Sequence, residues 1–226
     1  MAQTRLKTFE IPHKGLRSLL AQLTFMSGNT DFGDAAQVTR LHQLGRTLFQ
    51  LLTEHARDED EVLLAALEQR QPGATTANSE EHEMIEKQQA QLEQLFGDLI
   101  AQARRGEPAD LLAEQFYFAL NHFHSAYLMH MLGEEEETQR LLWKNFSDAE
   151  LLDLRKQILA RISPVSMLHW YRFAAPAMSH QDRLLWLQAA KAGAPAPFFG
   201  QIMETLEGVL SSVDFRKLER ELSTQN

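Results

Sequence analysis

Residues 112–134 read LAEQFYFALNHFHSAYLMHMLGE, and this stretch decides the fold. Its bulky apolar residues recur every three or four positions, at Leu112, Phe116, Leu120, Phe123 and Tyr127. Such spacing places these side chains on one face of an α-helix. The same face continues into His130 and Glu134, which occupy positions that packing alone would give to leucine. A buried face that carries a histidine and a carboxylate one turn apart indicates more than a structural helix.

Three other stretches repeat this pattern, in which an apolar face carries histidine. The first has His13 in line with leucines, the second has His55 followed by Glu59, and the third has His82. The four helices that we expect cover about residues 12–26, 34–70, 79–105 and 108–145. After Glu59, the apolar face of the second helix is expected to continue through Val62 and Ala66, and after Glu134 that of the fourth helix through Leu141. Each of the four helices therefore directs one histidine toward the interior.

Capping residues predict where several of these helices begin. Asn78, with Glu81 three residues later, is typical of a helix N-cap, and Pro108 suits a first helical position. Ser147 and Glu150 form a capping-box pattern that opens a fifth helix, ending near residue 162. After Ser163, short segments are separated by Pro, Gly and Ser, at about 165–177, 179–192, 196–210 and 212–223. We therefore predict a helical bundle over 1–163 and a C-terminal helical extension over 164–226.

The composition favours the same fold and limits the function. Among 226 residues there are 35 Leu but only 11 Val plus Ile, which predicts an all-α protein. The chain has no Cys, so thiolate metal sites are excluded and a reducing cytoplasm is the expected location. The formal net charge of −9 disfavours nucleic acid and anionic membranes as partners. No targeting or membrane-spanning segment is evident in the sequence.

The predicted heights along the helices allow the inward polar groups to meet. At 1.5 Å per residue, His55 lies ~31 Å from the start of its helix and His130 lies ~33 Å from the start of its own. By the same rise, His82 lies ~33 Å from the end of its helix, and His13 lies at the beginning of the first. In an antiparallel, up-down four-helix bundle with short loops, all four reach the same end. Buried polar groups are costly unless they share a partner, and a metal ion is such a partner.

The donor atoms narrow the choice of metal. Imidazoles and carboxylates without thiolates suit iron, manganese or zinc, and two inward glutamates at one level can bridge two ions. We therefore prefer a dinuclear iron site, with coordination positions left open for water, O₂ or a related diatomic. Its ligands would be four terminal histidines and two bridging glutamates: His13, His55, His82, His130, Glu59 and Glu134. Tyr127 would be a hydrogen-bond donor beside the site or part of the core, and Glu86 is expected at its flank.

The motifs also resemble a known family, over roughly residues 10 to 162. The His of IPHKGLRSLL, the His-x-x-x-Glu of TEHARDEDEVLLAAL, the His of NSEEHEMIEK and the His-x-x-x-Glu of YLMHMLGEEEE are similar to those of bacterial hemerythrin-like (HHE cation-binding) proteins. The resemblance implies an antiparallel four-helix bundle around a non-haem, oxo- or hydroxo-bridged di-iron centre, with the same six ligands. Animal oxygen-carrying hemerythrins have a further histidine where this chain has Glu86, so the resemblance is greater to the iron-sensing or redox-active branch.

Two classes of function follow from these patterns. In the first, a cytoplasmic di-iron protein binds or reacts with O₂, NO or peroxide, or senses iron or redox state. In the second, a metal-ordered regulatory module acts through residues 164–226, which would contact a protein partner or a second copy of the chain. A ferritin-like oxidase is disfavoured, because its Glu-x-x-His pattern occurs only from Glu10 to His13 and is interrupted by Pro12. The same ligands serve binding and catalysis, so the sequence does not decide whether the protein is an enzyme.

Overall fold

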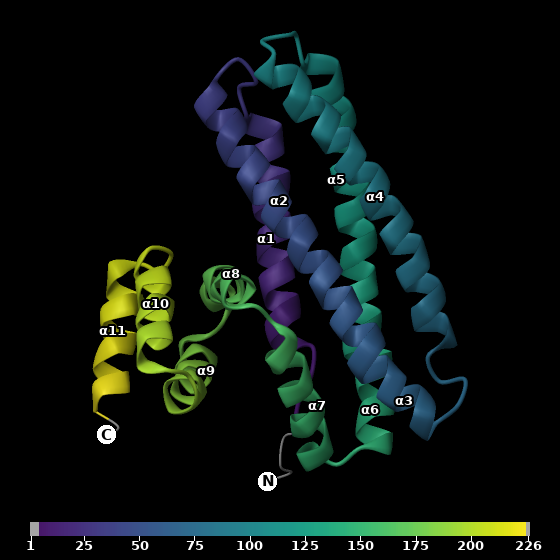
Figure 1. Cartoon of the computed structure of the whole chain (residues 1–226), viewed down its shortest axis with the longest axis vertical. Coiled ribbons are helices and arrows are strands. Elements are labelled where there is room, and N and C mark those ends of the chain that lie inside the picture. The colour runs from purple at the N-terminus through teal and green to yellow at the C-terminus, as the bar shows by residue number, and fades with distance from the viewer. Residues whose placement is uncertain (1–4, 225–226) are drawn as a thin grey trace. The chain divides into compact units, whose positions relative to one another are not determined.

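The computed structural model describes residues 5–224, and the predicted all-α fold is confirmed: these residues form helices and no β-strand (Figure 1). Two compact units divide the chain. The first unit contains residues 5–10 and 19–161, and the second contains residues 11–18 and 162–224. None of the described helices combines the length and the apolarity that a membrane span requires.

The first unit contains the four long helices that the sequence predicts. These are α1 (Glu10–Asn29, of which residues 19–29 belong to this unit), α2 (Ala35–Asp58), α4 (Thr76–Arg104) and α5 (Asp110–Gly133). Helix α4 packs against both α2 and α5. Helix α1 meets α5 where Thr24 Oγ1 lies 3.0 Å from His124 Nδ1. Short connections join successive helices, so they run antiparallel, as Figure 1 shows.

Leucine and phenylalanine fill the space between these helices. Of the residues predicted on the inward face of α5, Phe116 and Leu120 are completely buried and Phe123 and Tyr127 are nearly so, whereas Leu112 in the first turn is only half-buried. Gly45 of α2 allows a close approach, because a Cβ there would overlap Cε1 of Phe96 on α4. The absence of a side chain at residue 45 therefore lets α2 and α4 approach closely enough to place their polar residues together.

The helix starts agree with the sequence in some places and differ in others. The Ser147–Glu150 capping box is confirmed, since the Ser147 amide donates to Glu150 Oε2 (2.7 Å) and the Glu150 amide donates to Ser147 Oγ (3.3 Å). The predicted N-cap at Asn78 is wrong, because α4 already begins at Thr76, and the side-chain Nδ2 of Asn78 instead donates to Thr138 Oγ1 (2.9 Å). Pro108 precedes the first residue of α5, Asp110, by two positions and so is not its first helical residue.

Two π-helical turns interrupt the long helices, and each begins at one of the inward glutamates. Helix α2 passes into η1 (Glu59–Leu64) and then α3 (Ala65–Arg70), while α5 passes into η2 (Glu134–Thr138) and then α6 (Gln139–Asn145). A π turn contains one residue more than an α-helical turn, so the residues that face the interior after it are shifted by about one position along the sequence. The apolar faces expected through Ala66 and Leu141 are therefore wrong by one residue: Leu67 and Leu142 are the fully buried side chains.

Within the first unit, an apolar cluster lies where the chain continues past the two π turns. It joins the side chains of Phe9, Leu63, Leu67, Leu142, Phe146 and Leu151, the last from α7 (Asp148–Arg161). The N-terminal segment is tied to it by hydrogen bonds: Arg5 Nη2 donates to the Phe146 carbonyl (2.7 Å) and Trp143 Nε1 donates to the Leu6 carbonyl (2.7 Å). This packing holds α3 and α6, the helices that follow the two π turns, against each other.

The second unit has a core of its own. It consists of α8 (Pro164–Ala174), the 3₁₀ turn η3 (Ala175–Ala177), α9 (His180–Gly193), α10 (Ala196–Glu207) and α11 (Ser212–Ser223), together with residues 11–18. Tyr171 stacks on Trp186 with ring centroids 4.1 Å apart, among buried aliphatic residues. The start of α1 fits against α8 through Gly15, whose Cβ would lie 3.2 Å from that of Ala174. The predicted division between 1–163 and 164–226 stays a prediction.

Candidate metal centre

Five of the six residues predicted as ligands lie together in the first unit. His55 lies in the last turn of α2 and Glu59 begins η1, while His130 lies in the last turn of α5 and Glu134 begins η2. His82 comes from α4, between these two pairs. All five side chains are buried, and the two carboxylates are only 2% and 1% exposed. The polar groups that the sequence placed on apolar faces therefore do face the interior.

The donor atoms of these residues are close neighbours. His55 Nε2 lies 3.2 Å from Glu59 Oε1, and the matching pair, His130 Nε2 and Glu134 Oε2, lies at 3.4 Å. His82 Nε2 lies 3.5 Å from the other oxygen of Glu134. Each His-x-x-x-Glu motif thus forms a local pair, and His82 joins the second pair from a neighbouring helix.

Two overlapping sets of donor atoms result, and they share both carboxylates. One atom each of His55, Glu59 and Glu134 lies within 4.8 Å of the others, and the same holds for Glu59, His82, His130 and Glu134. A single ion would need only one such set. Two sets with two common carboxylates have the arrangement in which glutamates bridge a pair of ions.

The sixth predicted ligand, His13, lies on α1 and is fully buried. It belongs to residues 11–18, which are part of the second unit. Its place beside the other five residues stays a prediction.

Two acidic residues hold the histidines of α4 and α5 from behind. Asp60 Oδ1 lies 2.7 Å from His82 Nδ1, and Glu81 Oε2 lies 3.2 Å from His130 Nδ1. The hydrogen bond with Asp60 fixes the tautomer and the ring orientation of His82, so that its Nε2 faces the shared carboxylates, and Glu81 places a negative charge beside His130. The sequence pattern indicated a helix cap for Glu81 and no role for Asp60. Each acid directly follows or precedes a predicted ligand in the chain, and that adjacency is the only signal the sequence offers.

The charges of this cluster call for a cation. Burial lowers the pKa of His82, but hydrogen bonding to Asp60, the close approach of Glu134 and the charge of Glu59 outweigh it and raise the pKa to about 10. Burial, together with the charges of Glu59 and Glu134, raises the pKa of Tyr127 well above its usual value. Without a metal, a proton on His82 therefore balances part of the buried negative charge.

The donor set fits metal ions better than it fits a proton alone. No hydrogen bond reaches the buried Nε2 of His82 within the described part of the chain. Buried carboxylates are rarely tolerated without pairing or coordination. Imidazole nitrogen and carboxylate oxygen are the donors that iron, manganese and zinc share, so the residues present fit the group that the sequence implied.

The π turns explain how the motif reaches this geometry. In a regular α-helix, a glutamate four residues after a histidine lies on the same face one turn away. Here the helix widens at that glutamate in both η1 and η2, and Asp60, Glu61 or the run Glu135–Glu137 fills the wider turn. Single π turns inside α-helices occur frequently at functional sites.

The other candidate residues lie outside the two donor sets. Tyr127 is buried, and its ring centroid lies 5.3 Å from that of His130 in an edge-on contact. Glu86 is exposed on α4. His42 is half-buried and accepts a hydrogen bond from Arg104 (2.9 Å), and His122 is exposed.

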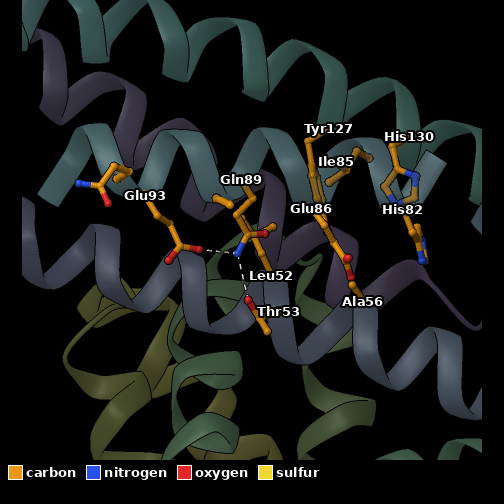
Figure 2. Close-up of a pocket in the computed structure, with 12 residues that line it drawn as sticks. Leu52, Thr53, Ala56, His82, Ile85, Glu86, Gln89, Glu93, Tyr127 and His130 are labelled. Carbon is orange, nitrogen blue, oxygen red and sulfur yellow. Dashed lines mark hydrogen bonds between the residues drawn. The ribbon is translucent and has the colours of Figure 1, made fainter. Parts of the chain in front are cut away.

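A pocket of about 560 Å³ opens beside the cluster, between α2 and α4, and reaches α5 (Figure 2). His82, His130 and Tyr127 line one part of it. Glu86, Gln89 and Glu93 of α4 continue the lining away from the histidines, as Figure 2 shows. The helical face pattern did not predict this pocket.

A four-helix bundle with these buried His and Glu clusters is a cation-binding bundle. Comparison with known families agrees, because residues 4–142 match the family model described as "Hemerythrin HHE cation binding domain". The chain belongs to this family, and the predicted resemblance is confirmed at that level. Among curated proteins, the chain is similar to "Zinc finger protein BRUTUS-like At1g18910" of Arabidopsis thaliana, with 28% identity over 161 residues. That match covers 69% of this chain but only 12% of the relative. No solved structure matches.

Proposed function

We propose that the chain binds two iron ions through His55, Glu59, His82, His130 and Glu134, with the two glutamates as bridges. The observation that carries this proposal is the pair of overlapping donor sets that share both carboxylates. His13, as the remaining histidine of the predicted set, would complete the first of them. Zinc or manganese would fit the same donors.

The activity that we propose is binding of, or reaction with, O₂, NO or peroxide, or sensing of iron or redox state through the centre. Two bound iron ions would supply one-electron chemistry and open coordination positions for such small ligands. The chain's own residues orient the donors through Asp60 and Glu81, keep Tyr127 protonated beside the cluster and enclose it in apolar side chains. Enclosure of this kind slows loss of the ions and exposure to water. A cytoplasmic location stays a prediction.

The test is the metal content per chain, measured by plasma mass spectrometry on protein purified without chelator or affinity metal. We expect about two iron ions and an absorption spectrum that changes when O₂ is added to the reduced sample. Glu59→Ala and Glu134→Ala should lower the iron content and weaken the near-ultraviolet absorption of the bridged pair, as should His130→Ala.

His122→Ala provides the matched control, because it removes an exposed histidine from the same helix as His130. It should leave the iron content unchanged. Iron content that stays the same in both glutamate variants would contradict the proposed ligands. Absence of iron after anaerobic reconstitution would contradict the di-iron function itself.

A second proposal, a regulatory or interaction module, is supported by the C-terminal helices. They have their own core, and within residues 162–224 no cluster of potential metal ligands occurs. Leu185 and Val213 are exposed there, at 58% and 68%. If these residues contact a second copy, Leu185→Glu with Val213→Glu should lower the sedimentation coefficient of the full chain. An unchanged coefficient would exclude self-association through these residues.

A further inference from the structure

The pocket beside the donor cluster is larger than a diatomic ligand needs. Its volume is about 560 Å³. A water molecule takes up roughly 30 Å³ of the liquid, so a divalent ion with six waters needs about 180 Å³. The pocket therefore has room for a hydrated ion, and His82 and His130 form part of its wall.

A column of polar side chains on α4 runs through this pocket. His82, Glu86, Gln89 and Glu93 are spaced four, three and four residues apart, which places them along one helix face. All four line the pocket, and Figure 2 shows Glu93, Gln89 and Glu86 following one another toward His82. Glu93 and Glu86 are exposed, whereas Gln89 and His82 are buried, so the column joins two solvent-accessible carboxylates to a buried imidazole.

Hydrogen bonds hold the outer part of this column in place. Gln89 Nε2 donates to Thr53 Oγ1 of α2 (3.0 Å) and to Glu93 Oε1 (2.7 Å). These two bonds, drawn in Figure 2, keep the Glu93 carboxylate at the pocket instead of leaving it to rotate in solvent. Gln89 is itself buried, at 8% exposure, and so forms a fixed part of the wall.

The charge of the pocket selects cations. None of the 12 lining residues is Lys or Arg, whereas Glu86 and Glu93 supply two carboxylates. Carboxylates in a cleft raise the local concentration of cations and lower that of anions. A neutral diatomic gains nothing from this charge. At the inner end, the buried Nε2 of His82 has no hydrogen-bond partner within the described residues.

We propose that this pocket is the route by which a hydrated divalent metal ion reaches the buried donor cluster. Glu93 and Glu86 attract the ion and lead it to His82 and His130, but they are not ligands of the loaded centre. This inference rests on the proposed function, because it requires that the cluster binds metal.

The test is the rate of metal uptake by the full-length, metal-free chain. Cobalt(II) is the probe, because its absorption changes when water ligands are replaced by protein donors, and mixing is followed by stopped-flow absorbance. The variant is Glu86→Gln with Glu93→Gln, which keeps the shape of the pocket and removes both charges. The control is Glu83→Gln with Asp98→Asn, which removes two exposed charges from the same helix outside the pocket.

At low ionic strength, loss of the two pocket charges should slow uptake on the order of tenfold, and added salt should shrink the difference. The amount of cobalt bound at the end should equal that of the unchanged chain. Cobalt uptake by the pocket variant that is as fast as uptake by the control would overturn the proposal. A lower final amount of bound cobalt in the pocket variant would also overturn it, because the two glutamates would then be ligands of the metal. Failure of the unchanged chain to bind cobalt or iron would instead overturn the proposed function.

Discussion

The hydrogen bond between Asp60 and His82 should set the metal affinity of the centre, and Asp60→Asn removes its charge. The two atoms lie 2.7 Å apart, which is the length of a charge-assisted bond. Hydrogen bonds to charged groups contribute about 1.5 to 3 kcal/mol. At 1.36 kcal/mol per factor of ten, this predicts a loss of affinity of roughly 10- to 150-fold, similar to other changes behind metal-bound histidines.

The size of this loss should depend on pH. Asp60 also raises the pKa of His82 in the metal-free chain, so it strengthens the proton that competes with the metal. Removing its charge weakens metal and proton binding together. The loss should therefore be larger near pH 9, which is closer to the pKa of His82 and where the proton competes less, than at pH 7, where the two effects cancel to a greater extent.

Competitive titration with a chelator measures this affinity at both pH values. Glu81→Gln should show a smaller loss, because its carboxylate lies 3.2 Å from His130 and is 41% exposed. Glu61→Gln is the control, because Glu61 is the neighbour of Asp60 in the chain. The Glu61 side chain is exposed and pairs with Arg161. Affinity of the Asp60 variant within twofold of the control at both pH values would refute the role assigned to this bond.

Three further outcomes are expected. Metal binding should release the proton of His82, whose pKa in the metal-free chain is about 10. The apparent metal affinity should therefore rise about tenfold per pH unit between pH 7 and that pKa. Calorimetry in two buffers counts the protons that metal binding releases. Gly45→Ala should lower the free energy of unfolding by about 1 to 3 kcal/mol, because the new Cβ would overlap the ring of Phe96 on α4. Gly97→Ala should raise the free energy of unfolding by up to about 1 kcal/mol, because a Cβ at residue 97 would have nothing within 4 Å. Denaturant titration measures both changes. Leu142→Ala should cost about 2 to 5 kcal/mol by the same assay and Leu141→Ala distinctly less, and equal losses would contradict the register after η2.

The helical face pattern was sufficient to predict the bundle and the inward residues of its long helices. On α5, the residues predicted on the inner face from Phe116 to His130 are all buried. This works because a regular helix repeats every 3.6 residues, so sequence spacing converts directly into direction. The capping box at Ser147 was predictable for a similar reason, since its hydrogen bonds connect residues three positions apart.

Features that depend on a change of helix type or on contacts between helices were not predictable. The π turns in η1 and η2 have no sequence signature that the periodic pattern detects, so Leu67 and Leu142 were missed by one position. Asp60 and Glu81 were missed because each meets a histidine on another helix. Their partners could be found only once the relative rotation of α2, α4 and α5 was known.

The two π turns also reveal a repetition that the amino-acid spacing conceals. Helix α2 with η1 and α3, and helix α5 with η2 and α6, follow the same order: histidine, a glutamate four residues later, a widened turn, and a buried leucine eight residues after that glutamate. The two interrupted helices therefore have the same single-residue insertion at the same distance from their histidines. An alignment of the two segments needs no gap from His55 to Leu67 against His130 to Leu142, so a substitution in one segment has a defined counterpart in the other.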